Sequence, residues 1–190
     1  MDYWFTADYH LGHANIIKYC NRPFESLEKM NEAIIRNHNA RVKKEDVVFH
    51  IGDFCFKNSG GGKEGEQFGA EHYESKLNGK LIQIRGNHDY NNNTKSIIDG
   101  VSIHHGGLGI WLTHDPRNYE RRFKLNLVGH VHQKWKLRKA EGAILLNIGV
   151  DVWRFMPVGI NEILEEYEKA AKNIGSITGY MAEKNEVEDG

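Results

Sequence analysis

The sequence lacks the marks of a membrane-spanning or disulfide-stapled protein. Its longest unbroken apolar run is four residues, Ala143–Leu146, far short of the roughly 18 that a membrane span needs. The first ten residues contain neither the basic segment nor the long apolar segment of a secretory signal. The two cysteines, Cys20 and Cys55, form no CxxC pair, so we expect idle thiols rather than a disulfide framework or zinc knuckle. These absences favour a cytoplasmic protein with no membrane partner.

The sequence also lacks a charge bias. Lys and Arg number 25 and Asp and Glu 26, so the formal net charge of −1 provides no broad basic field for a polyanion. The length of 190 residues and the hydrophobic share of 39% suit one compact domain. We expect that domain at residues 1–174, followed by a disordered acidic tail at 175–190 that has little apolar material to dock.

Short β-rich runs alternate with helical patterns, which is typical of an α/β fold. Ser26 is the expected N-cap of the first helix, and Gly106-Gly107 is a two-residue hairpin signal. The Gly-rich segment 58–65 is a candidate lid. We expect two facing mixed sheets with helices outside and the active site along one sheet edge. The expected strands are 3–7, 47–51, 81–85, 101–105, 108–114, 124–128, 134–139 and 143–149, and the expected helices are about 27–40, 66–77 and 161–172.

Polar blocks follow five of the expected strands. Loops at the carboxyl ends of strands line one crevice in open α/β sheets, so these blocks are expected to converge. Alternate residues share a face of an extended segment, which places Asp8 with His10 and His130 with His132. The blocks are Asp8-x-His10, Gly52-Asp53, Gly86-Asn87-His88-Asp89, His114, and Gly129-His130-Val131-His132.

These blocks hold a ligand set that suits two metal ions. Carboxylate and imidazole together favour Mn, with Fe or Zn as alternatives, over Mg or Ca. Asp53 is the only carboxylate in its block and is the natural bridge between two ions. His104 and His105 flank a hairpin and are expected in solvent, so His114 is the preferred lone ligand. The seven expected ligands are Asp8, His10, Asp53, Asn87, His114, His130 and His132.

The ordered blocks resemble the signature of the calcineurin-like metallophosphoesterase family, D-x-H, G-D, G-N-H-D/E, H and G-H-x-H. The resemblance covers about Tyr3 to Trp153, and the strings at 10–17, Arg22-Pro23-Phe24 and 147–157 are similar to its small bacterial and phage branch. It implies a metallophosphoesterase-like two-sheet sandwich flanked by helices. By the resemblance, Asp8, His10, Asp53 and His132 would hold one ion, and Asp53, Asn87, His114 and His130 the other.

The resemblance also implies a reaction. Two ions clamp the phosphate oxygens and lower the pKa of a water, so that the resulting metal-bound hydroxide attacks phosphorus. His88 would stabilise the transition state or protonate the leaving oxygen, and Asp89 would fix the tautomer of His88. The expected activity is therefore hydrolysis of phosphate esters without a covalent intermediate.

One departure from the family bears on the substrate. Many relatives have Arg after the G-N-H-D/E block, where this chain has Tyr90. A phosphate-gripping guanidinium would then be absent or come from Arg22 or Arg117, which favours phosphodiesters because a dianionic monoester gains more from Arg. His13 and Asn15 are further candidate substrate contacts, and a structural role for His13 is an equal alternative.

Three alternatives stay open at this stage. The chain is a phosphodiesterase acting on a nucleotide or a nucleic-acid end, a phosphomonoesterase or small nuclease of the same family, or a non-catalytic scaffold on the same fold. The complete ligand set and His88 argue against the scaffold. His38, His50 and His72 fall within expected helices or strands and are interpreted as structural.

Overall fold

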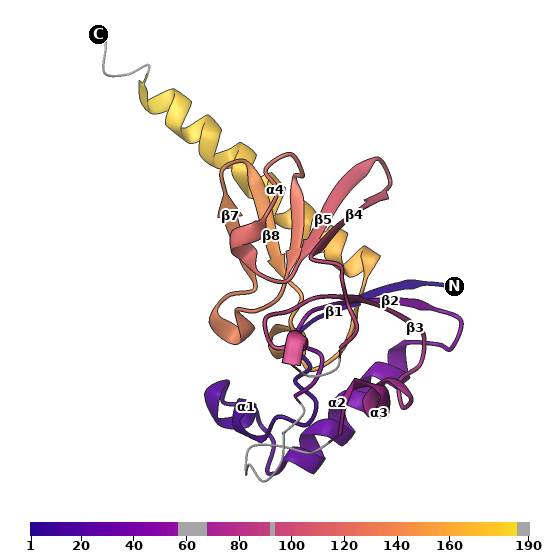
Figure 1. The fold of residues 1–190 in the computed structure, drawn as a ribbon. Coiled ribbons are helices and arrows are strands. Elements are labelled where there is room, and N and C mark those ends of the chain that lie inside the picture. The colour runs from indigo at the N-terminus through magenta and orange to yellow at the C-terminus, as the bar shows by residue number, and fades with distance from the viewer. Residues whose placement is uncertain (57–67, 92–93, 186–190) are drawn as a thin grey trace.

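The computed structural model describes residues 1–56, 68–91 and 94–185, which form two facing mixed sheets with helices outside (Figure 1). In the first sheet, β1, β2 and β3 are parallel and β9 is antiparallel to β1. The α/β fold expected from the alternation of strands and helices is therefore confirmed. The strand order is β3 (Lys80–Ile84), β2 (Val47–Ile51), β1 (Tyr3–Thr6) and β9 (Val158–Gly159).

The second sheet contains the β-rich half of the chain. Its three central strands, β5, β6 and β8, are parallel, and an antiparallel strand flanks them on each side. Gly106 and Gly107 join β4 to β5 with φ angles of 55° and 80°, a backbone that favours glycine, as the hairpin signal predicts. The strand order is β4 (Gly100–His105), β5 (Leu108–Thr113), β6 (Leu125–Val128), β8 (Ala143–Asn147) and β7 (Leu137–Ala140).

Helices α2 and α3 cover the outer face of the first sheet, α1 lies to the side of it, and α4 lies beside β1, β8 and β9 (Figure 1). In α2 the Ser26 hydroxyl accepts a hydrogen bond from the Lys29 N–H at 3.2 Å, which confirms the expected N-cap. Among the described residues, no helix combines the length and the apolarity that a bilayer span requires. The helices are α1 (Ala14–Tyr19), α2 (Leu27–Arg41), α3 (Ala70–Glu74) and α4 (Ile160–Asn185).

Two apolar cores hold these layers together. The larger core lies between the sheets, where Phe5 and Ile51 of the first meet Leu112 and Leu127 of the second. The smaller core joins the first sheet to the helices, where Met30 and Ile34 of α2 are fully buried. Burial of such side chains stabilises the fold by about 1.5–3 kcal/mol each. The two cores fix the strand ends that carry the polar blocks.

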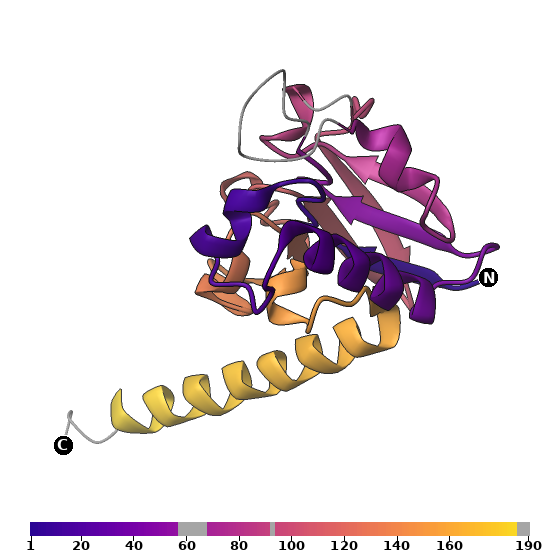
Figure 2. The ribbon, with the colours of Figure 1, turned by 90° about the horizontal axis from the view of Figure 1, so that it is seen from below.

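The structure differs from the sequence expectations at several elements. Helix α1 and strand β9 were not expected. Within the helix expected at 66–77, the structure has the shorter helix α3. Residues 57–67 lie outside the described residues. The candidate lid at 58–65 lies outside them as well. Helix α4 continues to Asn185, beyond the expected end at about 172, and extends past the sheets (Figure 2). The disordered tail stays a prediction, and residues 186–190 lie outside the described part.

Candidate metal centre

Five loops that follow strands meet at one edge of the sandwich. Two of the loops follow β1 and β2, which are parallel and adjacent, and two follow β5 and β6, which are also parallel and adjacent. Because parallel strands end at the same edge, their loops converge although the residues span most of the chain. Two groups of ligating side chains result, each with ligand atoms within 4.8 Å of one another: Asp8, His10 and His132, and Asp53, His114 and His130.

Asp53 lies between the two groups. Its Oδ2 atom is 3.4 Å from Nε2 of His10, a member of the first group, and 3.3 Å from Nε2 of His114, a member of the second. The Asp53 side chain is almost fully buried, so these imidazoles are its immediate polar surroundings. A carboxylate in this position can bind two ions at once.

Asn87 joins the second group through its side-chain oxygen. Its Oδ1 atom is 3.1 Å from Nε2 of His114 and 2.8 Å from Nδ1 of His130. Asn87 is exposed, whereas His114 is buried, so this group reaches from the interior to the surface. The amide oxygen completes the seven residues that the sequence predicted to converge.

The backbone is strained where the ligands are placed. Non-glycine residues with positive φ are uncommon because Cβ then crowds the backbone. Such angles gather at the polar blocks, and strain of this kind persists only when surrounding contacts hold it in place. The residues at the site with positive φ are Asp8 (59°), His10 (50°), Asp53 (56°), His130 (70°) and His132 (48°).

Two glycines allow the loops to approach one another. A Cβ at Gly52 would collide with the ring of His114 and with the backbone of Gly86, and Gly52 has a φ of 82°. A Cβ at Gly86 would collide with the side chain and backbone of Asp53. The glycine of each block is therefore required for the close contact between the β2 and β3 loops.

The histidine tautomers suit metal binding. Nδ1 of His114 lies 2.8 Å from the carbonyl oxygen of Ile51 and donates its proton there, so Nε2, which faces Asp53, is the nitrogen that a cation would bind in place of a proton. His10 contacts Nδ1 of His13 through its own Nδ1 at 3.3 Å. Within the described residues, Nε2 of His10 is buried and has no hydrogen-bond partner. An orphaned imidazole nitrogen beside a buried carboxylate fits a cation ligand.

The charges of the site favour a cation. Burial raises the pKa of Asp8 to about 6, and the neighbouring Asp53 acts in the same direction. Burial would also raise the pKa of Asp53, but the hydrogen bond from His114 and the charges of His114 and His10 outweigh it and lower this pKa. Two buried carboxylates so close together are costly unless positive charge lies between them.

Two imidazoles provide part of that positive charge. Burial lowers the pKa of His114, yet its hydrogen bond to Asp53 and the charge of Asp8 raise this pKa to about 9. Burial likewise lowers the pKa of His132, but its hydrogen bond to Asp151 outweighs that effect and raises the pKa to about 10. Cations that replace these protons would satisfy the same carboxylates.

His88 lies at the rim and Asp89 lies beneath it. The His88 ring is exposed, with its centroid 5.4 Å from that of His10, and its backbone N–H donates to Oδ1 of Asp53 at 2.9 Å. The Asp89 carboxylate instead accepts from the backbone N–H groups of Asp53, Phe54 and Gly86 at 2.7–3.0 Å. The expected contact between Asp89 and the His88 imidazole is thus replaced by contacts that bind the loops together.

The four candidate substrate contacts occupy different surroundings. His13 is buried and stacks on Phe56 with ring centroids 4.3 Å apart, and Asn15 is half-buried in α1. Arg117 is exposed in the loop after His114, where it pairs with Asp115. Arg22 is buried, and its guanidinium faces the protein interior rather than the mouth of the site.

Four further histidines have the surroundings that the sequence predicted, and His72 is half-buried in α3. His104 and His105 are exposed. His38 is buried in α2 and contacts the Tyr9 hydroxyl at 2.8 Å, and His50 is buried in β2. Both cysteines are buried, and they form no disulfide.

Asp151 is the residue of this region that sequence reasoning missed. Its Oδ2 atom lies 2.9 Å from Nδ1 of His132, and both carboxylate oxygens accept from Arg22. Asp151 belongs to no block, and only its place within the 147–157 string pointed to it.

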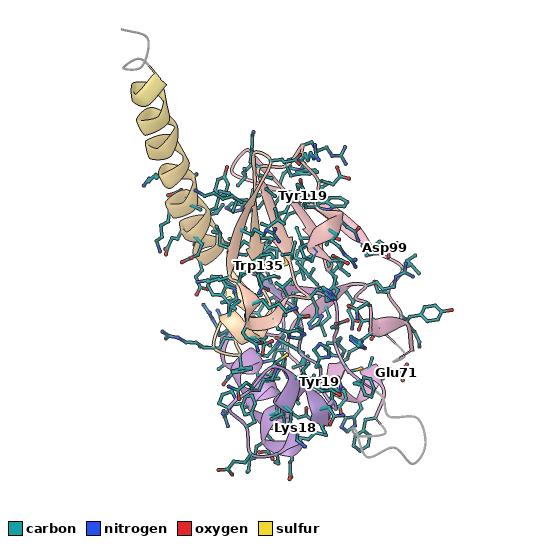
Figure 3. The ribbon with its side chains drawn as sticks, turned by 90° about the vertical axis from the view of Figure 1, so that its left-hand side faces the viewer. Lys18, Tyr19, Glu71, Asp99, Tyr119 and Trp135 are labelled. Atoms are coloured by element: carbon teal, nitrogen blue, oxygen red, sulfur yellow. The ribbon has the colours of Figure 1, made fainter. Side chains whose placement is uncertain are left out.

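Figure 3 shows one face of the molecule. On it, Tyr19 of α1 lies below Trp135, which follows the His132 turn.

Comparisons with known proteins give relatives over most of the chain. No family model matches. The uncharacterised protein MJ1445 of Methanocaldococcus jannaschii is 32% identical over 176 residues, which cover 87% of this chain and 91% of that protein. The protein of unknown function AQ665 from Aquifex aeolicus has a TM-score of 0.64 at 25% identity, covering 86% of this chain and 98% of its own. YfcE, a phosphoesterase from E. coli, has a TM-score of 0.43 at 18% identity, covering 77% and 78%.

Proposed function

Because this chain belongs to the same family as the archaeal protein MJ1445 and has the calcineurin-like metallophosphoesterase fold, we propose that it hydrolyses phosphate esters with two divalent ions. The position of Asp53 carries this proposal. One of its oxygens lies 3.4 Å from a histidine of the first group and 3.3 Å from a histidine of the second, as a bridge between two ions requires.

The ligands divide between the ions as follows. Asp53 serves both, because it lies between the groups. Asn87 belongs with the second ion, because its oxygen lies within 3.1 Å of two histidines of that group. One ion would be held by Asp8, His10 and His132 with Asp53, and the other by Asp53, His114 and His130 with Asn87.

Carboxylate, amide and imidazole ligands together favour Mn, with Fe or Zn as alternatives. A bound pair of such ions supplies the nucleophile by lowering the pKa of a water, and it neutralises the phosphate oxygens. The chain contributes the rigid strand ends, the strained backbone and the buried surroundings that fix the ligands. His88, exposed at the rim and close to His10, donates a proton to the leaving oxygen or stabilises the transition state.

The surroundings of the site favour phosphodiesters over monoesters. Tyr90 stands where many relatives have Arg, and its side chain is exposed. The Arg22 guanidinium is engaged in the interior, which leaves the exposed Arg117 as a candidate phosphate contact. His13 and Asn15 are proposed to contact the rest of the substrate, which is a nucleotide or the end of a nucleic acid. A monoanionic diester needs a guanidinium less than a dianionic monoester does.

The test is hydrolysis of two chromogenic esters by the full chain after chelation and metal addition. We expect bis-p-nitrophenyl phosphate to be hydrolysed with Mn, and p-nitrophenyl phosphate to be hydrolysed more slowly. Chelation should remove the activity and Mn should restore it. Activity that persists after exhaustive chelation would contradict the proposal.

The same assay decides between the alternatives. Faster turnover of the monoester would identify a phosphomonoesterase, and release of nucleotides from single-stranded ends would identify a small nuclease. A chain that binds two ions but hydrolyses none of these substrates would be a non-catalytic scaffold.

A further inference from the structure

The buried Arg22 side chain hydrogen-bonds both to the Asp151 carboxylate and to the backbone at Asp8. Its Nε and Nη2 atoms donate to the two carboxylate oxygens of Asp151 at 2.8 and 3.0 Å. Its Nη2 and Nη1 atoms also donate to the carbonyl oxygens of Asp8 and Tyr9 at 2.7 and 2.9 Å. With the remaining N–H directed at the Met30 sulfur at 3.5 Å, all five guanidinium N–H groups have an acceptor.

Asp151 transmits this contact to a ligand of the first ion. Its side chain is 3% exposed, and its Oδ2 atom lies 2.9 Å from Nδ1 of His132. A carboxylate acceptor at Nδ1 holds the proton on that nitrogen and leaves the Nε2 lone pair for a cation. The carboxylate therefore sets both the tautomer and the direction of the ring.

The same guanidinium holds the backbone of a second ligand. Asp8 has a positive φ of 59°, a conformation that costs energy unless surrounding contacts enforce it. Arg22 provides one of those contacts, because its Nη2 atom donates a hydrogen bond to the Asp8 carbonyl oxygen. Asp8 and His132 are members of one ligand group, so a single buried ion pair orients two of its three residues.

We propose that the buried Arg22–Asp151 pair is a positioning device for the first ion, acting through the His132 ring and the Asp8 backbone. The proposal rests on the proposed function, because it needs a metal centre to position. The second group has no comparable pair in the described part of the chain: His114 is oriented by the Ile51 carbonyl and His130 contacts Asn87. Removing the charge of Asp151 should therefore weaken the first ion selectively.

The test is a titration of metal-free full-length chain with Mn²⁺, with free Mn²⁺ measured by electron paramagnetic resonance. We expect two ions per wild-type chain, and Asp151→Asn should weaken the first by about 10–100-fold, the usual effect of a lost partner behind a ligand. The second ion should change much less. The matched control is Glu162→Gln, which removes the carboxylate of the half-exposed Arg41–Glu162 pair and should leave both affinities unchanged.

A double-mutant cycle separates positioning from general damage. In a His132→Ala background, Asp151→Asn should lose most of its effect on metal affinity, because the ring through which it acts is gone. An equal loss in both backgrounds, or an unchanged first ion in folded Asp151→Asn, would overturn the proposal. A wild-type chain that binds no ion would instead overturn the proposed function, on which this inference depends.

Arg22→Lys provides a second route if Asp151→Asn leaves the guanidinium charge unpaired and the chain unfolds. Lysine keeps the positive charge beside Asp151. It cannot make the paired hydrogen bonds to both Asp151 oxygens while also donating to the carbonyl oxygens of Asp8 and Tyr9. We expect a folded protein by circular dichroism with a first ion bound more weakly than in Glu162→Gln. Wild-type affinity in Arg22→Lys would overturn the role of Arg22.

Discussion

The buried carboxylates at the two ends of the first sheet have different polar surroundings. At the amino end, the Asp46 carboxylate accepts from the backbone N–H groups of Asp2 and Lys43 at 2.8 and 2.9 Å and from the Trp4 indole at 3.0 Å. At the carboxyl end, Asp8 and Asp53 are buried within one cluster of imidazoles, with the strained backbone of the loops around them. The carboxylate at the first end is satisfied by the fold, whereas those at the second end belong to the groups that the proposed cations would complete.

The pKa values of these carboxyls follow the same division. Hydrogen bonds from Lys43 and Asp2 lower the pKa of Asp46 to about 2, so its charge stabilises the fold. Burial raises the pKa of Asp8 to about 6, so its charge opposes folding until a cation binds. One sheet thus has a stabilising carboxylate at one end and an electrostatically unfavourable carboxylate at the other, as expected for the proposed metal centre.

The largest effect is expected for Asp53→Asn, at the centre of the carboxyl end. The variant should lose hydrolysis by about 10³-fold or more, as expected when charge is removed from the reacting centre. Both ions should weaken together, because one carboxylate serves both groups. A Mn²⁺ titration that loses only one ion would contradict the bridging role and would assign Asp53 to a single group.

The next effect is expected for His88→Ala, which removes a rim side chain while the ligands stay in place. Both ions should remain bound, and turnover should slow by about 10²–10⁴-fold, the usual range for a lost acid or base. The loss should be larger for an alkyl leaving group than for p-nitrophenol, which leaves without protonation. Near-normal rates with the poor leaving group would remove His88 from the mechanism.

Asp8→Asn tests how much the buried Asp8 charge at the carboxyl end of the sheet lowers the stability of the metal-free chain. In the metal-free chain, the variant should be more stable than the wild type by about 1–2 kcal/mol, the gain typical of relieving strain at a functional site. The amide keeps an oxygen that can accept from the His130 N–H. Urea denaturation of both chains without metal measures the difference. A less stable variant would show that the Asp8 charge supports the metal-free fold.

The convergence of the motif blocks was predictable because hydrophobic patterning placed each block after a strand, and parallel strands end together. Contacts outside these blocks between residues far apart in the chain were not predictable. Arg22 and Asp151 are separated by 129 positions, and no spacing signals their pairing. Asp89 follows His88 in sequence, which suggested a contact, but a tight turn directs its carboxylate to three backbone N–H groups. Helix α1 is too short for its apolar period to be recognised.

The smallest effect on activity is expected at the amino end, for Asp46→Asn. Hydrolysis should stay within about twofold of wild type, because the change lies at the other end of the sheet from the ligands. Stability at pH 7 should fall, because the amide loses the charge that the N–H donors of Asp2 and Lys43 stabilise.

The pH dependence of that loss identifies its cause. The pKa of Asp46 falls from 3.8 to about 2 on folding, so the carboxylate contributes its stability above about pH 4 and loses it as the pH falls through 2. Urea denaturation of wild type and Asp46→Asn should therefore differ at pH 7 and converge near pH 2. Glu45→Gln makes the same charge change at the exposed neighbouring residue and should shift stability by less than about 0.5 kcal/mol. A difference between wild type and Asp46→Asn that is constant with pH would assign the loss to packing, and the contrast between the two ends of the sheet would then no longer be electrostatic.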